Sequence, residues 1–341
     1  MLQSDDRDRF DSVPVTVITG FLGSGKTTVL NRLLRVPKLA DTAVIINEFG
    51  EVSLDHLLIE QAIENAVLLK NGCICCTVRG DILDTVNELF RKRETGELPW
   101  FRRIAIETTG LADPAPVVHT LLDTDQPCHM DGIVVTADAI HIRAQLDQQE
   151  EARNQVALAD RILLTKTDLV TRAEVDVVEP MIRAFNAQAP IRRIVDGDVT
   201  PDDVFGLGPE QRPANWLRPA VREHDHDHAH HHHHGIASVV LRAEQPVPWP
   251  ALALWLDSLL SLHGADVLRL KGIVRVAGVA RPVVVQAVHH VLHMLVTLPP
   301  EAEAAWGGPG SEIVVIQRGL PEAGLHASFA AALSERSTRV A

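Results

Sequence analysis

Residues 14–28 read PVTVITGFLGSGKTT, and this stretch decides the fold of the first half of the chain. A β-branched run at residues 15–19 leads into it, and a helical pattern over residues 27–35 follows. Glycines between a strand and a helix let backbone N–H groups converge on phosphate oxygens at the helix N-terminus. The spacing from Gly20 to Thr27 matches a phosphate-binding loop, and the stretch therefore predicts a nucleotide site.

Two side chains of this loop carry specific expectations. Lys26 is expected to reach the β- and γ-phosphates, and the Thr27 hydroxyl to ligate Mg²⁺. The other loop residues expected to contact the nucleotide are Gly20, Gly23, Ser24, Gly25 and Thr28. The alternative is a glycine turn that resembles the motif by chance, and the flanking strand and helix argue against it.

Residues 102–114, RRIAIETTGLADP, predict the magnesium side of the site. A buried strand ends at Glu107, where phosphate-loop enzymes often place an acid that holds Mg²⁺ or its water. Gly110 follows three residues later and is expected to offer its N–H to the γ-phosphate. An ordinary acid at the end of a strand is the alternative.

The base is predicted from residues 161–170, RILLTKTDLV. Guanine presents N1–H and a 2-amino group side by side, and one carboxylate accepts from both, whereas adenine lacks this donor pair. Asp168 is placed for that contact, and the stem of Lys166 for covering the ring. Thr165 stands where the usual guanine motif has an Asn that braces the loop, which leaves base affinity open, and a surface Lys and Asp after a strand is the alternative.

The phosphate loop belongs to a longer α/β alternation, which predicts a mainly parallel sheet covered by helices on both faces. Amphipathic helices are expected at residues 82–92 and 176–187. Short apolar runs are expected to form strands at residues 15–19, 43–47, 66–70, 103–107, 132–136, 161–165 and 191–195.

The second half of the chain has a different texture. Residues 201–235 are rich in Gly and Pro and end in HDHDHAHHHHHG, which predicts a flexible His-rich linker between a phosphate-loop domain at 1–200 and a smaller α+β domain at 236–330. Helices are expected at residues 249–263 and 325–335. Strands of a largely antiparallel sheet are expected at residues 236–243, 267–278, 282–288 and 311–320.

Bulk composition narrows the class of protein. The 341 residues suggest two domains at roughly 100–200 residues each. A formal net charge of −13 disfavours nucleic acid and anionic membranes as partners. No apolar run approaches the roughly 18 residues that span a bilayer. The charged N-terminal residues 1–10 do not resemble a signal peptide, and we expect a cytoplasmic protein.

Three of the four cysteines fall within NGCICCTVR, residues 71–79. In a reducing compartment, clustered Cys indicate metal binding or redox work rather than a structural disulfide. Cys73, Cys75 and Cys76 meet one ion only if the chain turns there, and we expect a helix to begin near Thr77 and to favour thiolates. Thiolates with an added carboxylate or imidazole suit tetrahedral Zn²⁺, and small buried residues are the alternative.

A further ligand is expected from Glu48, after the strand at residues 43–47. Spacing leaves open whether Glu48 reaches the cysteines or the Mg²⁺, and a solvated loop acid is the third possibility.

The His run at residues 224–235 has the chemistry of a weak metal reservoir, with a solvated linker or an engineered tag as alternatives. His289, His290 and His293 are expected on a helix or strand edge, with His289 and His293 on one helical face and a structural role.

Together these segments resemble the CobW-like GTPases, metallochaperones related to the GTPases that insert nickel into hydrogenase and urease. The resemblance rests on GFLGSGKTT (20–28), INEFGE (46–51), GCICCTVRGDILD (72–84), ETTGLADP (107–114), TKTDL (165–169) and QAVHHVLH (286–293). It covers most of the chain, and Thr165 departs from the usual Asn. It implies GTP hydrolysis to GDP with Mg²⁺, and Zn²⁺ or Co²⁺ held by Cys73, Cys75, Cys76 and Glu48.

These observations together favour a GTP-driven carrier that delivers metal to a client metalloprotein or metal-insertion enzyme. Segments 48–51 and 107–113 are expected to sense the γ-phosphate and to shape the metal pocket. No strong general base or arginine finger is recognisable, so slow turnover is expected, quickened by a partner or by a homodimer. A zinc buffer and an interaction switch with a structural metal remain alternatives.

Overall fold

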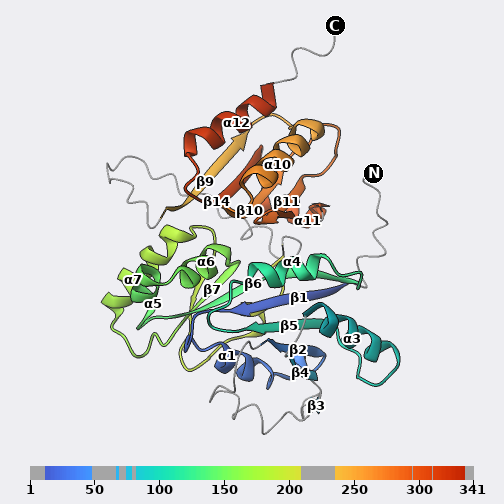
Figure 1. Cartoon of the computed structure of the whole chain (residues 1–341), viewed down its shortest axis with the longest axis vertical. Helices are drawn as coiled ribbons and strands as arrows, with labels where there is room; N and C mark the ends of the chain where they lie inside the picture. The colour runs from blue at the N-terminus through green and yellow to red at the C-terminus, as the bar shows by residue number, and fades with distance from the viewer. Residues whose placement is uncertain are drawn as a thin grey trace. The chain divides into compact units, whose positions relative to one another are not determined.

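The computed structural model describes residues 12–47, 67–68, 74–78, 82–208, 235–293, 295–308 and 310–334. The chain divides into two compact units, one around each of two β-sheets (Figure 1). Among the described residues, none of the helices is both long and apolar enough to cross a bilayer.

The first unit is built on an eight-stranded sheet in the order β3-β4-β2-β5-β1-β6-β7-β8. All neighbouring strands are parallel except β3 and β4, which confirms the predicted mainly parallel α/β fold. The strands are β1 (Val13–Thr19), β2 (Thr42–Asn47), β3 (Val67–Leu68), β4 (Ile74–Val78), β5 (Arg103–Thr108), β6 (Cys128–Asp138), β7 (Arg161–Thr165) and β8 (Ile191–Arg193). The helices along this part of the chain are α1 (Lys26–Leu33), α3 (Ile82–Glu94), α4 (Ala115–Leu122), α5 (Ile142–Gln148), α6 (Glu150–Leu158), α7 (Arg172–Phe185) and α8 (Pro201–Val204), and residues 156–158 of α6 and 179–185 of α7 are grouped with the second unit.

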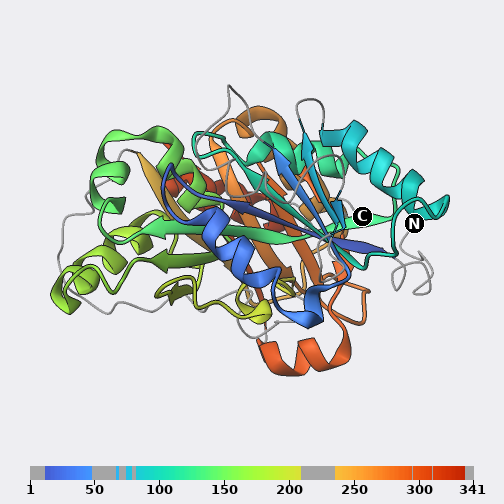
Figure 2. The ribbon, with the colours of Figure 1, turned by 90° about the horizontal axis from the view of Figure 1, so that it is seen from below.

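The central strands are apolar on both faces because helices cover both. α1 lies on one side of the strands, and α3 and α4 lie on the other (Figure 2). Leu30 and Leu33 of α1 pack in a core cluster with Ile18 of β1 and Val44 of β2. Burial on both faces explains why these strands read as continuous apolar runs rather than as an alternating pattern.

The cysteine segment differs from the sequence expectation. A helix beginning near Thr77 is wrong: β4 runs through Val78 and pairs in parallel with β2, and α3 begins only at Ile82. Ile74, Thr77 and Val78 are β-branched, and an apolar neighbouring strand gives them a ladder to join. The start of α3 therefore does not directly follow Cys76.

The first unit continues past residue 200, into the stretch that composition assigns to the linker. Thr200 and Asp203 form a capping box at the start of α8, which fixes a short helical turn. Val204 and Leu207 are buried in the same core cluster as α1. The His run at 224–234 lies outside the described residues.

The second unit is a six-stranded sheet in the order β12-β11-β10-β14-β9, with β13 paired to β11. Every pairing in it is antiparallel, as predicted. Its strands are β9 (Ile236–Ala243), β10 (Val267–Val274), β11 (Val283–Val288), β12 (Val291–Leu292), β13 (Val296–Thr297) and β14 (Ser311–Arg318). Its helices are α10 (Trp249–His263), α11 (Pro300–Trp306) and α12 (Glu322–Ser334), and Trp255 of α10 packs edge-on against Phe329 of α12.

His289, His290 and His293 lie beside strands β11 and β12, which agrees with the strand edge that was one of their two expected placements, and not on a helix. His289 and His290 connect β11 to β12, and His289 adopts a positive φ of 51°. His293 follows β12, donates its backbone N–H to the Gln286 carbonyl, and is buried. The expected shared helical face of His289 and His293 is therefore wrong.

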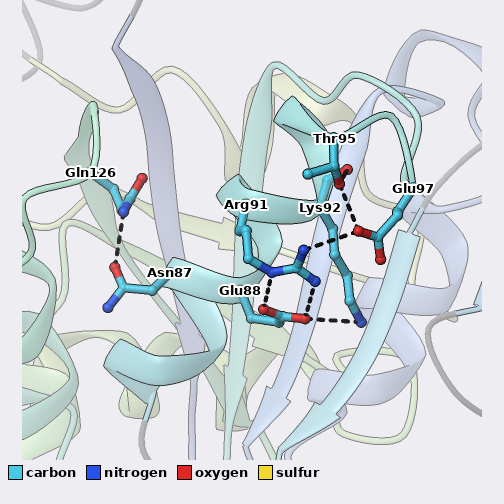
Figure 3. A network of polar contacts seen from close by, with 7 residues as sticks. All are labelled: Asn87, Glu88, Arg91, Lys92, Thr95, Glu97 and Gln126. Atoms are coloured by element: carbon cyan, nitrogen blue, oxygen red, sulfur yellow. Dashed lines mark hydrogen bonds and ion pairs between the residues drawn. The ribbon is translucent and has the colours of Figure 1, made fainter.

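The C-terminal half of α3 shows how differently two neighbouring arginines are used. Arg91 pairs with Glu88 and Glu97 on the surface, where Lys92 and Thr95 join the same network (Figure 3). The hydrogen bond from Arg91 lowers the pKa of Glu88 to about 2. Arg93 is buried instead, and its guanidinium lies 4.3 Å from the centroid of the Trp100 ring and 4.5 Å from that of Phe90. Burial lowers the pKa of Arg93.

We expect Arg93→Ala to destabilise the protein by about 1–3 kcal/mol, because it removes cation–π contacts and leaves a void under exposed Trp100. Arg91→Ala is the matched control on the same helix, and its solvent-exposed ion pairs predict a far smaller effect. Urea unfolding of both variants measures the difference. Equal destabilisation by the two substitutions would contradict this prediction.

Candidate nucleotide and metal site

The loop between β1 and α1 has the backbone of a phosphate cradle. Gly20, Gly23 and Gly25 all adopt positive φ, and Gly25 is the N-cap of α1. A side chain at Gly20 would place its Cβ 2.3 Å from the Thr136 carbonyl oxygen, so β6 leaves room only for glycine there. A Cβ at Gly23 meets nothing among the described residues within 4 Å, so that side of the loop is open.

Lys26 and Thr27 start α1 and face different partners. The Lys26 ammonium donates to the carbonyls of Gly20 (2.8 Å) and Phe21 (3.3 Å), so it already lies over the loop. The Thr27 hydroxyl donates to Oε1 of Glu107 at the end of β5, at 2.7 Å, and Glu107 is buried. The structure thus brings together the two oxygen groups that the sequence assigned to Mg²⁺ from distant segments.

Gly110 lies directly on the phosphate loop. A Cβ at this position would fall 2.7 Å from the Leu22 nitrogen and 2.8 Å from its Cα, so only glycine allows this approach. Residues 109–112 form a turn closed by the Ala112 N–H and the Thr109 carbonyl. The segment after β5 therefore has a defined shape next to the phosphate cradle.

Thr165 supplies the brace that a missing asparagine had put in question. Its hydroxyl donates to the Ser24 carbonyl of the phosphate loop at 2.7 Å, and also lies 3.2 Å from the Ala137 carbonyl. The Thr165 side chain is buried, and Cγ2 would lie 3.6 Å from a Cβ at Gly25. A hydroxyl on a shorter side chain thus links the predicted base loop to the phosphate loop.

Lys166 is held by a residue that sequence reasoning missed. Its backbone has a positive φ of 58°, and its ammonium donates to Oδ2 of Asp138, the last residue of β6, at 2.7 Å. Burial alone would raise the pKa of Asp138, but hydrogen bonds with Lys166, His141 and the Ile140 amide outweigh it and lower that pKa. Asp168 is exposed two residues further on, as a side chain that receives a ligand should be.

The loop after β8 completes this end of the sheet. Asp196 and Gly197 both have positive φ, and a Cβ at Gly197 would lie 3.1 Å from Cγ2 of Thr28 on α1. Because β6, β7 and β8 are parallel neighbours, their carboxyl ends lie at one edge of the sheet. The predicted base-contacting residues and the phosphate loop therefore share one edge.

The predicted metal ligands are only partly described. Cys73 and Glu48 lie outside the described residues. Cys75 and Cys76 lie on β4, in register with Val44 and Ile45 of β2. Among the described residues, no group of three or more His, Cys, Asp or Glu is placed to hold a metal ion.

The sheet register nevertheless relates the cysteines to the magnesium side. Thr77 of β4, Ile46 of β2 and Glu107 of β5 form one row across three strands. Two strand spacings of about 4.8 Å and a rise of about 3.3 Å per residue place the Cα atoms of Cys75 and Cys76 about 10–12 Å from that of Glu107.

Cys128 and His129 are adjacent on β6 but make separate contacts. Burial raises the pKa of the Cys128 thiol to about 11, which keeps it protonated at neutral pH. His129 Nδ1 lies 2.9 Å from the Ser12 hydroxyl.

Removing the Thr165 hydroxyl tests the brace. We expect Thr165→Val to weaken guanine-nucleotide binding about 5–20-fold, because it leaves a buried Ser24 carbonyl without its donor. Thr165→Ser keeps the hydroxyl and should stay near wild type. Titration with a fluorescent GDP analogue measures both, and a Val variant with wild-type affinity would show that the hydrogen bond does not organise the loop.

The Asp138 anchor predicts a pH dependence. A lowered carboxyl pKa gives stability that is fully present above the ordinary value of about 3.9 and is lost as pH falls through the folded-state value. Asp138→Asn should therefore reduce the free energy of unfolding at pH 7 by about 1 kcal/mol or less, since Lys166 is one-third exposed. Urea unfolding from pH 7 down to pH 3 should show the gap between wild type and variant narrowing only at the acidic end. A gap independent of pH would rule out the ionic anchor.

Comparison with known proteins agrees with this geometry. Residues 14–193 match the family model described as CobW/HypB/UreG, nucleotide-binding domain, and residues 236–333 match the cobalamin synthesis protein cobW C-terminal domain. The zinc chaperone YjiA of Escherichia coli (strain K12) is 33% identical over 323 residues, covering 93% of this chain and 98% of its own. The zinc chaperone CobW of Sinorhizobium sp is 30% identical, covering 94% and 97%.

Solved structures give the same result. The crystal structure of Zn(II)-bound YjiA GTPase from E. coli superposes with a TM-score of 0.74 at 30% identity, over 94% of this chain and 99% of that one. The resemblance predicted from the sequence motifs is confirmed, as is the two-part fold. The chain belongs to the CobW/HypB/UreG family and carries the CobW-type C-terminal domain.

Proposed function

We propose that this protein hydrolyses GTP and uses the cycle to carry Zn²⁺ or Co²⁺ to a client metalloprotein or metal-insertion enzyme. The observation that carries the proposal is the 2.7 Å hydrogen bond between Thr27 and Glu107. Glu107 lies on β5, and only β2 separates β5 from β4, the strand that holds Cys75 and Cys76. The names of the similar proteins, zinc chaperones and a Zn(II)-bound GTPase, support zinc as the cargo.

The nucleotide chemistry is assigned to residues at one edge of the sheet. Lys26 leaves the Gly20 and Phe21 carbonyls and donates to the β- and γ-phosphate oxygens, which are stronger acceptors. Glycine backbone N–H groups and the N-terminus of α1 contact the same phosphates. Gly110 offers its N–H to the γ-phosphate from the turn that lies on Leu22.

The oxygen pair of Thr27 and Glu107 fits Mg²⁺, which prefers oxygen ligands and retains several waters. Bound there, the cation supplies charge neutralisation for the phosphate oxygens. Thr27 offers a direct ligand, and the buried carboxylate of Glu107 holds either the ion or one of its waters. Asp168 selects guanine by accepting from N1–H and the 2-amino group, while Lys166 covers the ring.

Coupling to the cargo metal runs through the β4-β2-β5 ladder. The three strands end together, because their last residues Asn47, Val78 and Thr108 lie in one row at one edge of the sheet. The γ-phosphate of GTP contacts the turn after Thr108, and this contact draws in the segment after Asn47, which brings Glu48 toward Cys73, Cys75 and Cys76. Hydrolysis removes the γ-phosphate contact, the segment after Asn47 is released, and the ion loses a ligand.

The energies allow this exchange. Moving a site from 1:99 to 99:1 occupancy takes about a 10⁴-fold change in affinity, about 5.5 kcal/mol. Structural Zn²⁺ sites bind with about 10–16 kcal/mol in total, so an equal share for one of four ligands is about 2.5–4 kcal/mol, which gives a partial shift of about 100-fold or more.

We expect Zn²⁺ or Co²⁺ affinity to be at least about 100-fold higher with a non-hydrolysable GTP analogue than with GDP, a coupling of about 3 kcal/mol. Competition with a chromophoric chelator in each nucleotide state measures it. Cys75→Ser and Cys76→Ser should lower metal affinity and remove the nucleotide dependence. Equal affinities in the two states would reject the coupling.

Measuring GTP turnover and the amount of bound ion in the same samples distinguishes the metal carrier from a zinc buffer and from an interaction switch. Lys26→Ala should abolish the phosphate release that wild type shows. A wild-type protein that binds zinc but releases no phosphate would indicate a zinc buffer. GTP-dependent client binding that survives Cys75→Ser would instead indicate a switch with a structural metal.

A further inference from the structure

Helix α6 contacts the turn at residues 109–112 through a buried glutamine that no sequence motif marks. The Gln155 side-chain amide donates to the Gly110 carbonyl at 3.2 Å and to the Ala112 carbonyl at 3.0 Å. Gln155 is 1% exposed. Its two N–H groups therefore fasten two carbonyls of the same turn at once, which a single-donor side chain could not do.

The contacts around Gln155 make the turn rigid from several directions. Asn154, the preceding residue of α6, donates to Oδ2 of Asp113, whose Oδ1 accepts from the Ala115 N–H at the start of α4. On the opposite side, the turn lies against Leu22 of the phosphate loop. The segment is thus held between α6 and the phosphate loop by contacts within the protein itself.

We propose that Gln155 is a positioning residue that preorganises the turn for the γ-phosphate, and so determines how strongly the site prefers a triphosphate to a diphosphate. This inference rests on the proposed function. With the Gly110 and Ala112 carbonyls held by α6, the backbone of Gly110 is fixed beside Leu22 of the phosphate loop. A turn that is already ordered loses less conformational entropy when GTP binds, and that saving applies only to ligands with a γ-phosphate.

Replacing the amide tests the inference. Gln155→Met keeps the length of the side chain and removes both donors. Gln155→Glu keeps the shape but directs carboxylate oxygens at two carbonyls. We expect affinity for a non-hydrolysable GTP analogue to fall about tenfold in the Met variant and further in the Glu variant, while GDP affinity stays within about twofold.

The ratio of the two affinities is the readout, because a general loss of structure would weaken both ligands alike. Gln188→Leu is the matched control: Gln188 is also a buried glutamine, but it belongs to the segment after α7, and its loss should leave the ratio unchanged. A Met variant with the wild-type ratio would overturn the inference. Failure of the wild-type protein to bind GTP would instead refute the proposed function.

A second measurement needs no variant and covers the case in which the substituted proteins fail to fold. Amide hydrogen exchange in nucleotide-free wild type should show the Ala112 N–H, which closes the turn by donating to the Thr109 carbonyl, protected, and GDP should not change that protection. Free exchange of this amide before the GTP analogue is added would show that the turn is ordered by the ligand and not by Gln155.

Discussion

The hydrogen bond from Thr165 to the Ser24 carbonyl is the constraint on which the site depends. It fastens the loop after β1 to the end of β7, while the Ser24 hydroxyl lies 2.6 Å from that of Thr136 on β6. Strands β6 and β7 thereby hold the loop after β1 through short, buried hydroxyl contacts. A loop of glycines has high conformational entropy, and these contacts restrict it before any phosphate arrives.

The parallel sheet sets the positions of the other side chains of the site. Glu107, Asp138 and Thr165 all stand at carboxyl ends of strands, and they reach Thr27, Lys166 and Ser24 respectively. Because neighbouring strands keep a fixed spacing and register, the Cα atoms of Cys75 and Cys76 on β4 lie about 10–12 Å from that of Glu107 on β5. The link between nucleotide and metal that we propose follows from this arrangement.

Much of this was predictable from particular residues. The glycine spacing from Gly20 to Gly25, between a strand and a helix, implies a phosphate cradle on local grounds, and β-branched runs between amphipathic segments imply a parallel sheet. The helix expected to begin near Thr77 was wrong, because residues 74–78 form β4 instead. The pairing of β4 with β2 is a contact between distant segments, which the residues around Cys75 and Cys76 do not reveal. The helical face expected for His289 was also wrong, because His289 lies in the turn between β11 and β12, and the pairing of these two strands is not visible in the local sequence.

The sequence by itself predicted the chemistry: the loop expected to bind phosphate, the acid expected beside the cation, and the family that the chain resembles. These predictions depend on residue types at short, fixed spacings, and the local backbone geometry follows directly from such spacings. The tertiary structure alone decided the support: that Thr165 replaces an asparagine as brace, that Asp138 holds Lys166, and that Gln155 fastens the turn at Gly110. Those partners are 28 to 141 residues apart, and only the folded sheet brings them within hydrogen-bonding distance.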